Sequence, residues 1–230
     1  MKLFFVILLF LFLASSAFVF AQTSAISFQP VYNNLPVKTD DTWFKLNSGD
    51  SISFETLKFY ISSIELLQDD KVVWKEENSF HLVNSTEEKT MRVELPVSSN
   101  LKFNKIKFNL GIDSATNVSG AMGGDLDPTK GMYWTWQNGY INFKLEGRCN
   151  RCNTRNNEFQ FHLGGYQFPN DAHQSIVLNC QQNKLPGINI DLEKLCEEID
   201  FSKGNHIMSP STRAVELSKK AASVFIVAGK

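Results

Sequence analysis

Apolar and polar residues alternate with a period of two along most of the chain, which is the pattern of β-strands with one buried face. One face of segment 139–147 carries an isoleucine, a phenylalanine and a leucine, and one face of segment 158–165 carries two phenylalanines and a leucine. The same pattern predicts further strands at 25–32, 56–68, 71–74, 79–84, 91–95, 101–113, 174–179 and 188–192. Short strands separated by turn sequences predict an antiparallel β-sandwich.

The alternation changes phase inside two of these strands. In TLKFYISSIELLQ the apolar face shifts by one residue at Ser62 and Ser63, and in LKFNKIKFNLGID it shifts at Asn104. A one-residue slip moves every later side chain to the other face unless the strand bulges. We therefore expect a bulge or a bend at these points.

Helical spacing is confined to the C-terminal part of the chain. Segment 211–227 follows a proline and places two alanines, a leucine and a valine on one helical face. A second short helix is predicted at 191–199. With no internal repeat and no obvious linker, the sequence predicts an all-β fold, an antiparallel β-sandwich with a short C-terminal helix, as a single domain over 22–230.

The N-terminal segment MKLFFVILLFLFLASSAFVFA has one basic residue, Lys2, followed by an apolar run that ends in small residues. This composition predicts a secretory signal peptide over residues 1–21, removed by cleavage. The alternative is an uncleaved N-terminal anchor, since the run approaches the length that spans a membrane. With the signal removed, no association with a membrane is expected.

The charge of the chain argues against nucleic-acid binding. It contains 23 basic and 24 acidic residues, and removal of Lys2 with the signal leaves a net charge of about −2. No basic stretch emerges that would bind phosphates.

Three aspartates lie in or beside a glycine-rich loop that ends in two tryptophans. The loop, GIDSATNVSGAMGGDLDPTKGMYW, contains Asp113, Asp125 and Asp127. Carboxylates at such spacing are candidate calcium ligands, although they do not match the twelve-residue EF-hand pattern. The alternative is that the aspartates form turns and helix caps.

The four cysteines of an exported chain predict two disulfides. We favour the pairs Cys149–Cys152 and Cys180–Cys196, which join a CxxC turn and tie the short helix to the strand before it. A redox CxxC is an alternative, but this one follows a strand and does not begin a helix. A four-cysteine zinc site would need a second close pair.

Two histidines are predicted on strands but off the apolar stripe, namely His81 and His162. Taken singly, each is a surface or half-buried residue with satisfied hydrogen bonds. Together with Met132 beside Trp134 and Trp136, they offer imidazole and thioether ligands, which suit copper and especially its reduced ion.

Four stretches follow one another in a distinctive order: FYISSIELL, SFHLVN, LGIDSATNVSGAMGGDLDPTKGMYWTWQNGYINFKLEG and FQFHLGGY. They resemble the MbnP-like family of periplasmic copper-binding proteins, known from methanobactin-associated copper handling. The most specific element is LDPTKGMYWTWQNGY followed by KLEG and FHLGG, and the resemblance extends to the final IMSPSTRAVELSKKAASVF. The chain departs from the family pattern in RCNRCNTRNN, where an ordinary loop is expected.

The resemblance implies a β-sandwich protein exported to the periplasm or the cell surface. Some members of the family bind copper through histidine and a tryptophan that has been oxidised to kynurenine. A di-haem enzyme resembling cytochrome c peroxidases is associated with that oxidation. The resemblance thus implies that Trp134 or Trp136 is oxidised, that His81 and His162 join it at copper, and that Met132 is a weak axial contact. Strand alternation would place both tryptophans on one face.

The leading hypothesis is a copper-binding protein, not an enzyme, that sequesters copper or hands it on outside the cytoplasm. A second hypothesis is a metal-independent binding module for a partner protein, peptide or glycan, with Trp134, Trp136 and neighbouring tyrosines as a stacking surface. A third is a secreted thiol oxidoreductase that uses Cys149 and Cys152. No nucleophile and base pair indicates a hydrolase.

Overall fold

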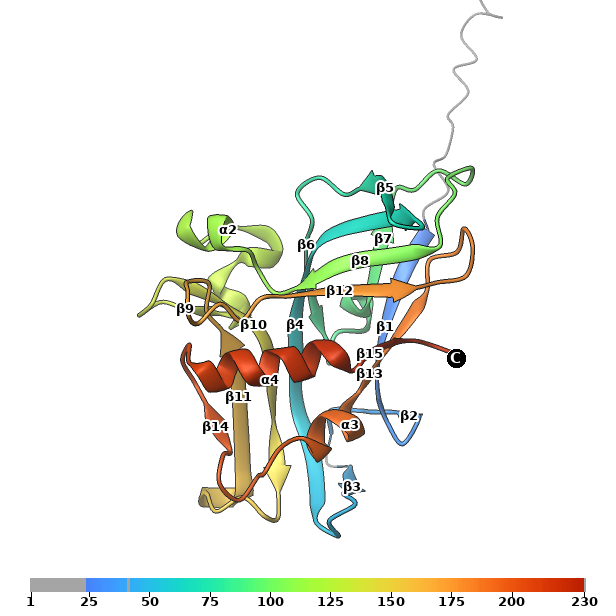
Figure 1. Ribbon diagram of the computed structural model, residues 1–230. Helices are drawn as coiled ribbons and strands as arrows, with labels where there is room; N and C mark the ends of the chain where they lie inside the picture. The colour runs from blue at the N-terminus through green and yellow to red at the C-terminus, as the bar shows by residue number, and fades with distance from the viewer. Residues whose placement is uncertain (1–23, 41, 230) are drawn as a thin grey trace, which may run out of the picture.

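The computed structural model describes residues 24–40 and 42–229, which form two β-sheets packed face to face with helices at one side (Figure 1). The predicted signal, residues 1–21, lies outside the described residues. The sandwich prediction is confirmed: strands dominate and helices are few, with a short helix near the C-terminus. Two of the strand pairs, β1–β13 and β11–β14, are parallel, so both sheets are mixed.

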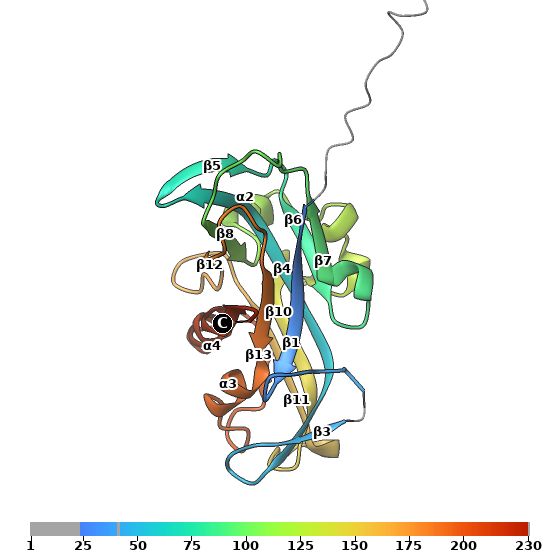
Figure 2. The ribbon, with the colours of Figure 1, turned by 90° about the vertical axis from the view of Figure 1, so that its right-hand side faces the viewer.

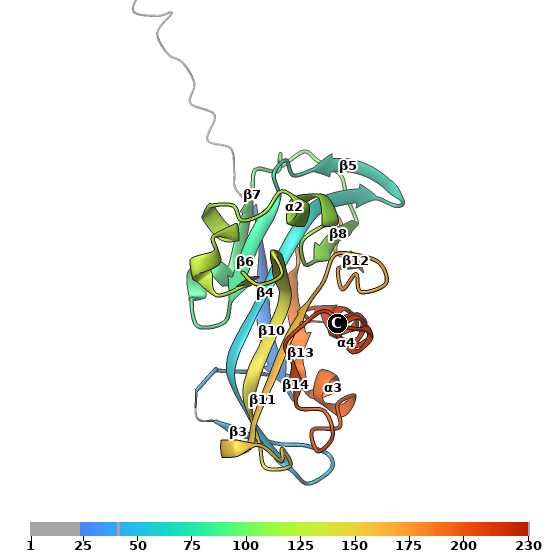
Figure 3. The same ribbon diagram turned by 90° about the vertical axis from the view of Figure 1, so that its left-hand side faces the viewer.

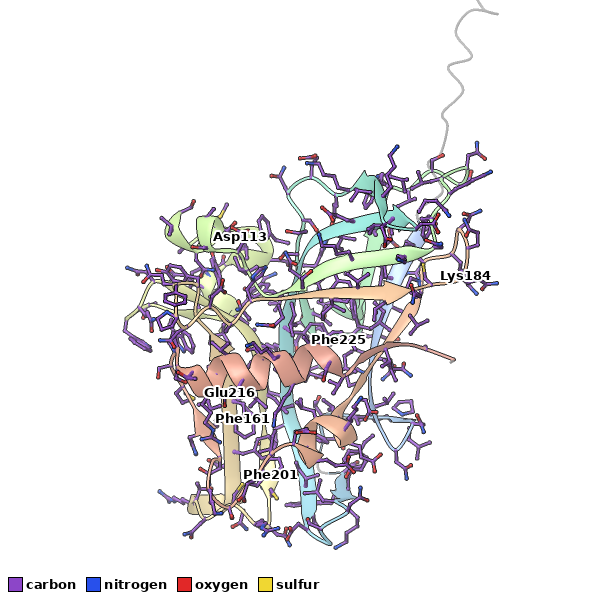
Figure 4. All side chains as sticks on the ribbon, viewed as in Figure 1. Asp113, Phe161, Lys184, Phe201, Glu216 and Phe225 are labelled. Atoms are coloured by element: carbon purple, nitrogen blue, oxygen red, sulfur yellow. The ribbon has the colours of Figure 1, made fainter. Side chains whose placement is uncertain are left out.

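The larger sheet is built around β4 (Ser51–Gln68), which runs through the whole molecule (Figures 1 and 3). Its strand order is β12 (Gln174–Asn179), β8 (Lys105–Leu110), β4, β10 (Gly139–Cys149), β11 (Glu158–Gly164) and β14 (His206–Ile207). Also paired with β4 are β3 (Trp43–Lys45), β5 (Lys71–Lys75) and β6 (Phe80–Asn84), while β9 (Tyr133–Trp134) pairs with β10.

The smaller sheet has the order β15 (Phe225–Val227), β13 (Gly187–Asp191), β1 (Ser24–Tyr32) and β2 (Leu35–Pro36), with β7 (Arg92–Leu95) also paired to β1. Figure 2 shows β1 and β13 side by side in front of the larger sheet. We call the face of the larger sheet that packs against these strands its inner face, and the opposite face its outer face.

The expected irregularity in β4 is confirmed. The register between β4 and β8 shifts between Ser62 and Glu65, and Ser63 has a positive φ of 52°. Strand β4 pairs with β10 up to Phe59 and with β8 from Ile61 onward, across the bulge, so the sheet divides into two branches. The second predicted shift, at Asn104, falls just before β8 begins.

Aromatic packing joins the two sheets at their inner faces. The ring of Phe59 on β4 lies 5.7 Å from that of Phe28 on β1 and 6.1 Å from that of Phe143 on β10, measured between centroids. It also meets Phe225 of β15 edge to face at 5.4 Å. This ring therefore contacts both sheets and is fully buried.

Two helices from the C-terminal part of the chain cover the edge of the sandwich between the two branches. Helix α4 (Thr212–Ser223) packs against β11 and β12 and buries an alanine and leucine face in the core, and α3 (Leu192–Glu197) packs against β1 (Figures 1 and 3). The predicted helix 211–227 was too long, because Phe225–Val227 forms β15. These aromatic and β-branched residues pair with Ile188–Ile190 of β13, and such residues favour strands.

A second apolar cluster covers part of the outer face of the larger sheet. The chain between β8 and β10 folds there into α2 (Ser114–Val118) and the short 3₁₀ turns η2 (Gly124–Leu126) and η3 (Pro128–Lys130). Two further 3₁₀ turns, η1 (Glu88–Met91) and η4 (Arg155–Asn157), lie elsewhere. We call this the outer cluster; its buried members are Tyr60, Leu82, Ile112, Leu126, Met132, Trp134, Tyr140 and Ile141.

Helices in the described part of the chain are all too short or too polar to cross a membrane.

Candidate functional site

His162 lies on the outer face of the larger sheet, beside the outer cluster. It is opposite Lys144 of β10, which is in turn opposite Lys58 of β4. The neighbouring residues Phe161 and Leu163 point to the inner face and belong to the main core. Only 7% of His162 is exposed, so its imidazole is packed against neighbouring residues and does not extend into water.

Glu146 is the hydrogen-bond partner of His162. The imidazole Nε2 lies 2.7 Å from Glu146 Oε1, and Lys144 Nζ lies 3.5 Å from the same oxygen. Burial alone would raise the pKa of Glu146, but hydrogen bonds from His162 and Thr56 and the charge of Lys144 lower it to about 2. The ionised carboxylate can only accept, so Nε2 carries the hydrogen and Nδ1 of the neutral ring keeps its lone pair.

The low pKa of Glu146 predicts a pH-dependent contribution to stability. The carboxyl has an ordinary value of 4.5 and a value of about 2 in the fold, so its contribution is complete above about pH 4.5 and disappears as pH falls toward 2. Glu146→Gln should therefore lower the free energy of unfolding at pH 7, and the difference from the native chain should shrink between pH 4.5 and 2. Denaturant unfolding over this pH range measures it.

A surface pair supplies the control for that measurement. Glu55 lies 2.7 Å from Arg148 Nε, and both side chains are more than two-fifths exposed. Exposed pairs contribute about 0–1 kcal/mol, so Glu55→Gln should change stability little at any pH. An equal effect of the two substitutions would contradict the role assigned to Glu146.

Trp134 lies against β11 close to His162. A Cβ placed on Gly164 would come within 2.7 Å of Trp134 Cζ3, so the glycine leaves the space that the indole fills. Gly164 follows His162 by two residues on the same strand, and therefore faces the same side about 7 Å further along. The structure thus places the Trp134 indole on the same face of β11 as His162, over the position two residues further along the strand.

Trp136 takes a different position from Trp134, contrary to the predicted alternation. Strand β9 ends at Trp134, and the chain turns over residues 135–138 before β10. Trp134 is 6% exposed and Trp136 is 65% exposed, with ring centroids 5.9 Å apart. The exposed indole lies beside the buried one at the rim of the sheet.

Met132 is also part of this region. It is fully buried in the outer cluster with Trp134, and its carbonyl accepts a hydrogen bond from the amide of Ile141. The thioether therefore belongs to the apolar wall behind the tryptophan.

His81 does not join the other candidate residues. It lies opposite Ile61, whose side chain is in the main core, whereas His162 shares the outer face with Lys58. The register between these positions is regular, so the two histidines project from opposite faces of the sheet. His81 Nε2 bonds to Glu76 Oε2 at 2.8 Å, at the rim of a groove lined by Met91 and other residues of η1 and β7.

The three loop aspartates each have a structural partner. Asp113 caps α2 through the amide of Thr116, and Asp127 caps η3 through the amide of Thr129. Asp125 accepts hydrogen bonds from the amide of Leu82 and from Lys130 Nζ. Within residues 24–40 and 42–229, no three histidine, cysteine, aspartate or glutamate side chains are placed to hold a metal ion.

Comparison with known proteins identifies the family. The family model described as MbnP matches residues 21–209. The chain belongs to the MbnP family. A solved structure similar to this MbnP-family chain is MbnP from Methylosinus trichosporium, with a TM-score of 0.63 and 14% identity over 84% of this chain and 86% of that one. At this identity the likeness concerns the fold. No curated protein matches the sequence.

The predicted disulfides of this MbnP-family chain are wrong: within the described residues none of the four cysteines is disulfide-bonded. Cys149 and Cys152 face each other across a turn as thiols. Cys180 and Cys196 lie at opposite ends of the molecule. The amide of Cys180 bonds to Asn104, beyond the Leu67 end of β4, whereas Cys196 lies close to Cys149, opposite Ile52.

Electrostatics distinguishes the thiols of Cys149, Cys152 and Cys196. A hydrogen bond from the Cys152 thiol, assisted by the amides of Arg151 and Cys152, outweighs burial and lowers the pKa of Cys149 to about 7. The pKa of Cys152 is raised by the same hydrogen bond and by burial. Burial and the charge of Cys149 raise the pKa of Cys196. Of these thiols, Cys149 is thus the one that loses its proton most readily.

Sequence reasoning missed Glu146 and Gly164 as site residues of this MbnP-family chain. Both lie in the KLEG and FHLGG elements, and the alternation of 139–147 already placed Glu146 on the polar face. Their roles depend on how the strands pair. Glu146 reaches His162 only because β10 and β11 are neighbours. Gly164 is contacted by the indole of Trp134, which belongs to the hairpin of β9 and β10.

Proposed function

We propose that the protein is a non-catalytic copper-binding protein that sequesters copper or hands it on, using His162 and an oxidised Trp134. The observation that carries the proposal is the position of the Trp134 indole over Gly164, on the same face of β11 as His162. Membership of the MbnP family supports a copper-related role. Export to the periplasm or the cell surface belongs to the same proposal.

The pairing of His162 with Glu146 suits a metal ligand. Histidine ligands commonly donate their second ring N–H to a carboxylate, which fixes the tautomer and makes the free nitrogen more basic. Here Nε2 bonds to the ionised Glu146, and Nδ1 is left to coordinate. Imidazole nitrogen is a good ligand for copper.

Trp134 would become a ligand only after oxidation. The nitrogen lone pair of an indole belongs to the aromatic system and binds metal poorly. Cleavage of the C2–C3 bond, with C2 lost as formate, leaves a ketone and an aryl amine, both of which can coordinate. The opened ring would add donors to a site that otherwise has one imidazole, with the thioether of Met132 behind it.

This oxidation needs an oxidant from outside the chain. Two molecules of hydrogen peroxide would each deliver one oxygen atom and leave as water, and one further water would release C2 as formate. The proposed catalyst is a partner enzyme of the di-haem cytochrome c peroxidase type. Trp134 is nearly buried, but Trp136 beside it is largely exposed. The exposed indole therefore marks the side from which such a partner would approach.

The two histidines give opposite expectations for copper binding. In protein purified from its native host, His162→Ala should weaken Cu(I) binding at the outer-face site about 100-fold or more, because it removes the imidazole that Glu146 orients. His81→Ala is the matched control and should leave the affinity unchanged, since His81 lies on the other face. Competition with a Cu(I) chelator measures both affinities.

Peptide mass spectrometry on the same samples tests the second ligand. Kynurenine is expected at Trp134 and intact indole at Trp136. Equal loss of affinity in the two histidine variants would overturn the site, and oxidation at Trp136 alone would overturn the choice of tryptophan.

A second function is favoured by the apolar residues exposed at the same end of the molecule. These include Val118, Met122, Trp136 and Phe168, which is 97% exposed. Exposed apolar patches mark surfaces that bind partners, so a metal-independent binding module is the alternative. Unmodified tryptophans and no copper in the native protein would favour it.

A further inference from the structure

The CxxC turn lies at the far end of β10 from the tryptophan site. Trp134 pairs with Gly139 at the start of this strand, and Cys149 is its last residue. Ten residues of extended chain separate the two ends by about 30 Å. Any chemistry at the cysteines is therefore independent of copper at His162.

The turn is held in place before any ligand binds. The amide of Cys152 donates to the carbonyl of Cys149 at 2.8 Å, which closes the turn. Asn150 exchanges two hydrogen bonds with Ser51, at 3.1 and 2.9 Å. Arg151 Nη1 lies 3.2 Å from Asp50 Oδ2. Both central residues of the turn are thus fixed to the segment where β4 begins.

Hydrogen bonds converge on the sulfur of Cys149. The thiol of Cys152 and the amides of Arg151 and Cys152 all donate to it. Such donors stabilise a thiolate and tune its affinity for metal. Because the two sulfurs already contact each other, both point into the same small volume, which is the arrangement that two ligands of one ion require.

From this geometry we infer that Cys149 and Cys152 form a second metal site, specific for a soft monovalent ion such as Cu(I). Thiolates are the ligands that soft ions prefer. Structural zinc needs four ligands, and the part of the chain that the structure describes has no third cysteine, histidine or carboxylate placed to complete such a set. Two sulfurs are enough for Cu(I), which accepts linear coordination.

The surroundings of the turn suit an ion that arrives by ligand exchange. Cys149 and Cys152 are buried, and the nearby Cys196, whose pKa is raised by burial, remains a thiol. Next to Cys196 and Arg151 is an open cavity of about 620 Å³. This cavity is the opening through which a carrier for Cu(I) would approach the turn.

Titration of the reduced full chain with Cu(I) under anaerobic conditions tests the inference. Thiolate-to-copper charge-transfer absorption is expected to saturate at about one ion per chain, and Zn(II) should not compete. Cys149→Ser with Cys152→Ser should abolish the absorption and lose that one ion. Cys180→Ser, at the other end of the molecule, is the matched control and should change neither.

His162→Ala separates this site from the tryptophan site. The variant should retain the charge-transfer absorption, and X-ray absorption of its bound copper should show sulfur ligands only. This measurement needs no change at the cysteines, so it remains decisive if the double variant misfolds. A shell of nitrogen or oxygen alone would overturn the inference, as would a Cys149–Cys152 disulfide in protein isolated from its native host.

Discussion

Phe59→Ala is expected to lower the free energy of unfolding by about 3–5 kcal/mol. The ring is fully buried and touches Phe28 and Phe225 of the smaller sheet as well as Phe143 of the larger one. Its removal would leave a cavity at the point where the sheets meet, and rings on three different strands cannot all move to fill it. Urea unfolding followed by circular dichroism measures the change.

An exposed phenylalanine provides the control for this substitution. Phe168 is almost entirely exposed, so Phe168→Ala should stay within about 0.5 kcal/mol of the native chain. Domains are stable by only about 5–15 kcal/mol, so loss of the Phe59 ring consumes a large share of that stability. A Phe59 variant as stable as the Phe168 variant would show that the sheets are not held together at this ring.

Gly164→Ala is expected to disturb both stability and the candidate copper site. The added Cβ would lie 2.7 Å from Trp134 Cζ3 and 2.7 Å from the carbonyl oxygen of Tyr140. The indole can move, but the carbonyl belongs to β10 and can shift only with the strand. We expect a loss of about 1–3 kcal/mol, typical of overpacking, and displacement of Trp134 away from His162.

Fluorescence and copper binding together measure this displacement. Tryptophan emission should shift as the indole gains exposure, and binding of Cu(I) to the native-host protein should fall. Gly123→Ala is the matched control, because no atom lies within 4 Å of its added Cβ. Unchanged emission in the Gly164 variant would mean that the indole does not depend on this glycine for its position.

Strand alternation predicted most of the fold, because it follows from burial along one strand. The bulge at Ser62 and Ser63 could be located to the residue, since the apolar face changes phase there. The same local rule failed for His81. His81 is predicted to lie off the apolar stripe, but the apolar neighbour Leu82 belongs to the outer cluster, so His81 points to the inner side. When a sheet carries apolar clusters on both faces, the alternation along a single strand does not show which of the two faces packs in the main core.

Contacts between segments that are far apart in the chain could not be predicted from the sequence. The disulfide prediction relied on cysteines that are neighbours in sequence, whereas the fold places Cys196 beside Cys149 and moves Cys180 to the far end. The separation of Trp134 from Trp136 depends on a turn that ends β9 two residues early. By contrast, the choice of His162 needed only the alternation of β11, and in the structure His162 lies on the same face of this strand as Trp134.

The smaller sheet has a consequence for the order in which the chain folds. Its first strand, β1, is among the earliest described residues to be synthesised, yet β13 and β15 come from residues 187–227. Closing so long a loop costs entropy before any contact repays it. During synthesis β1 must therefore remain without these partners until the last fifth of the chain has emerged. Segment 24–32 is then the part most exposed to wrong pairing, and a factor that shields it should raise the yield of folded protein.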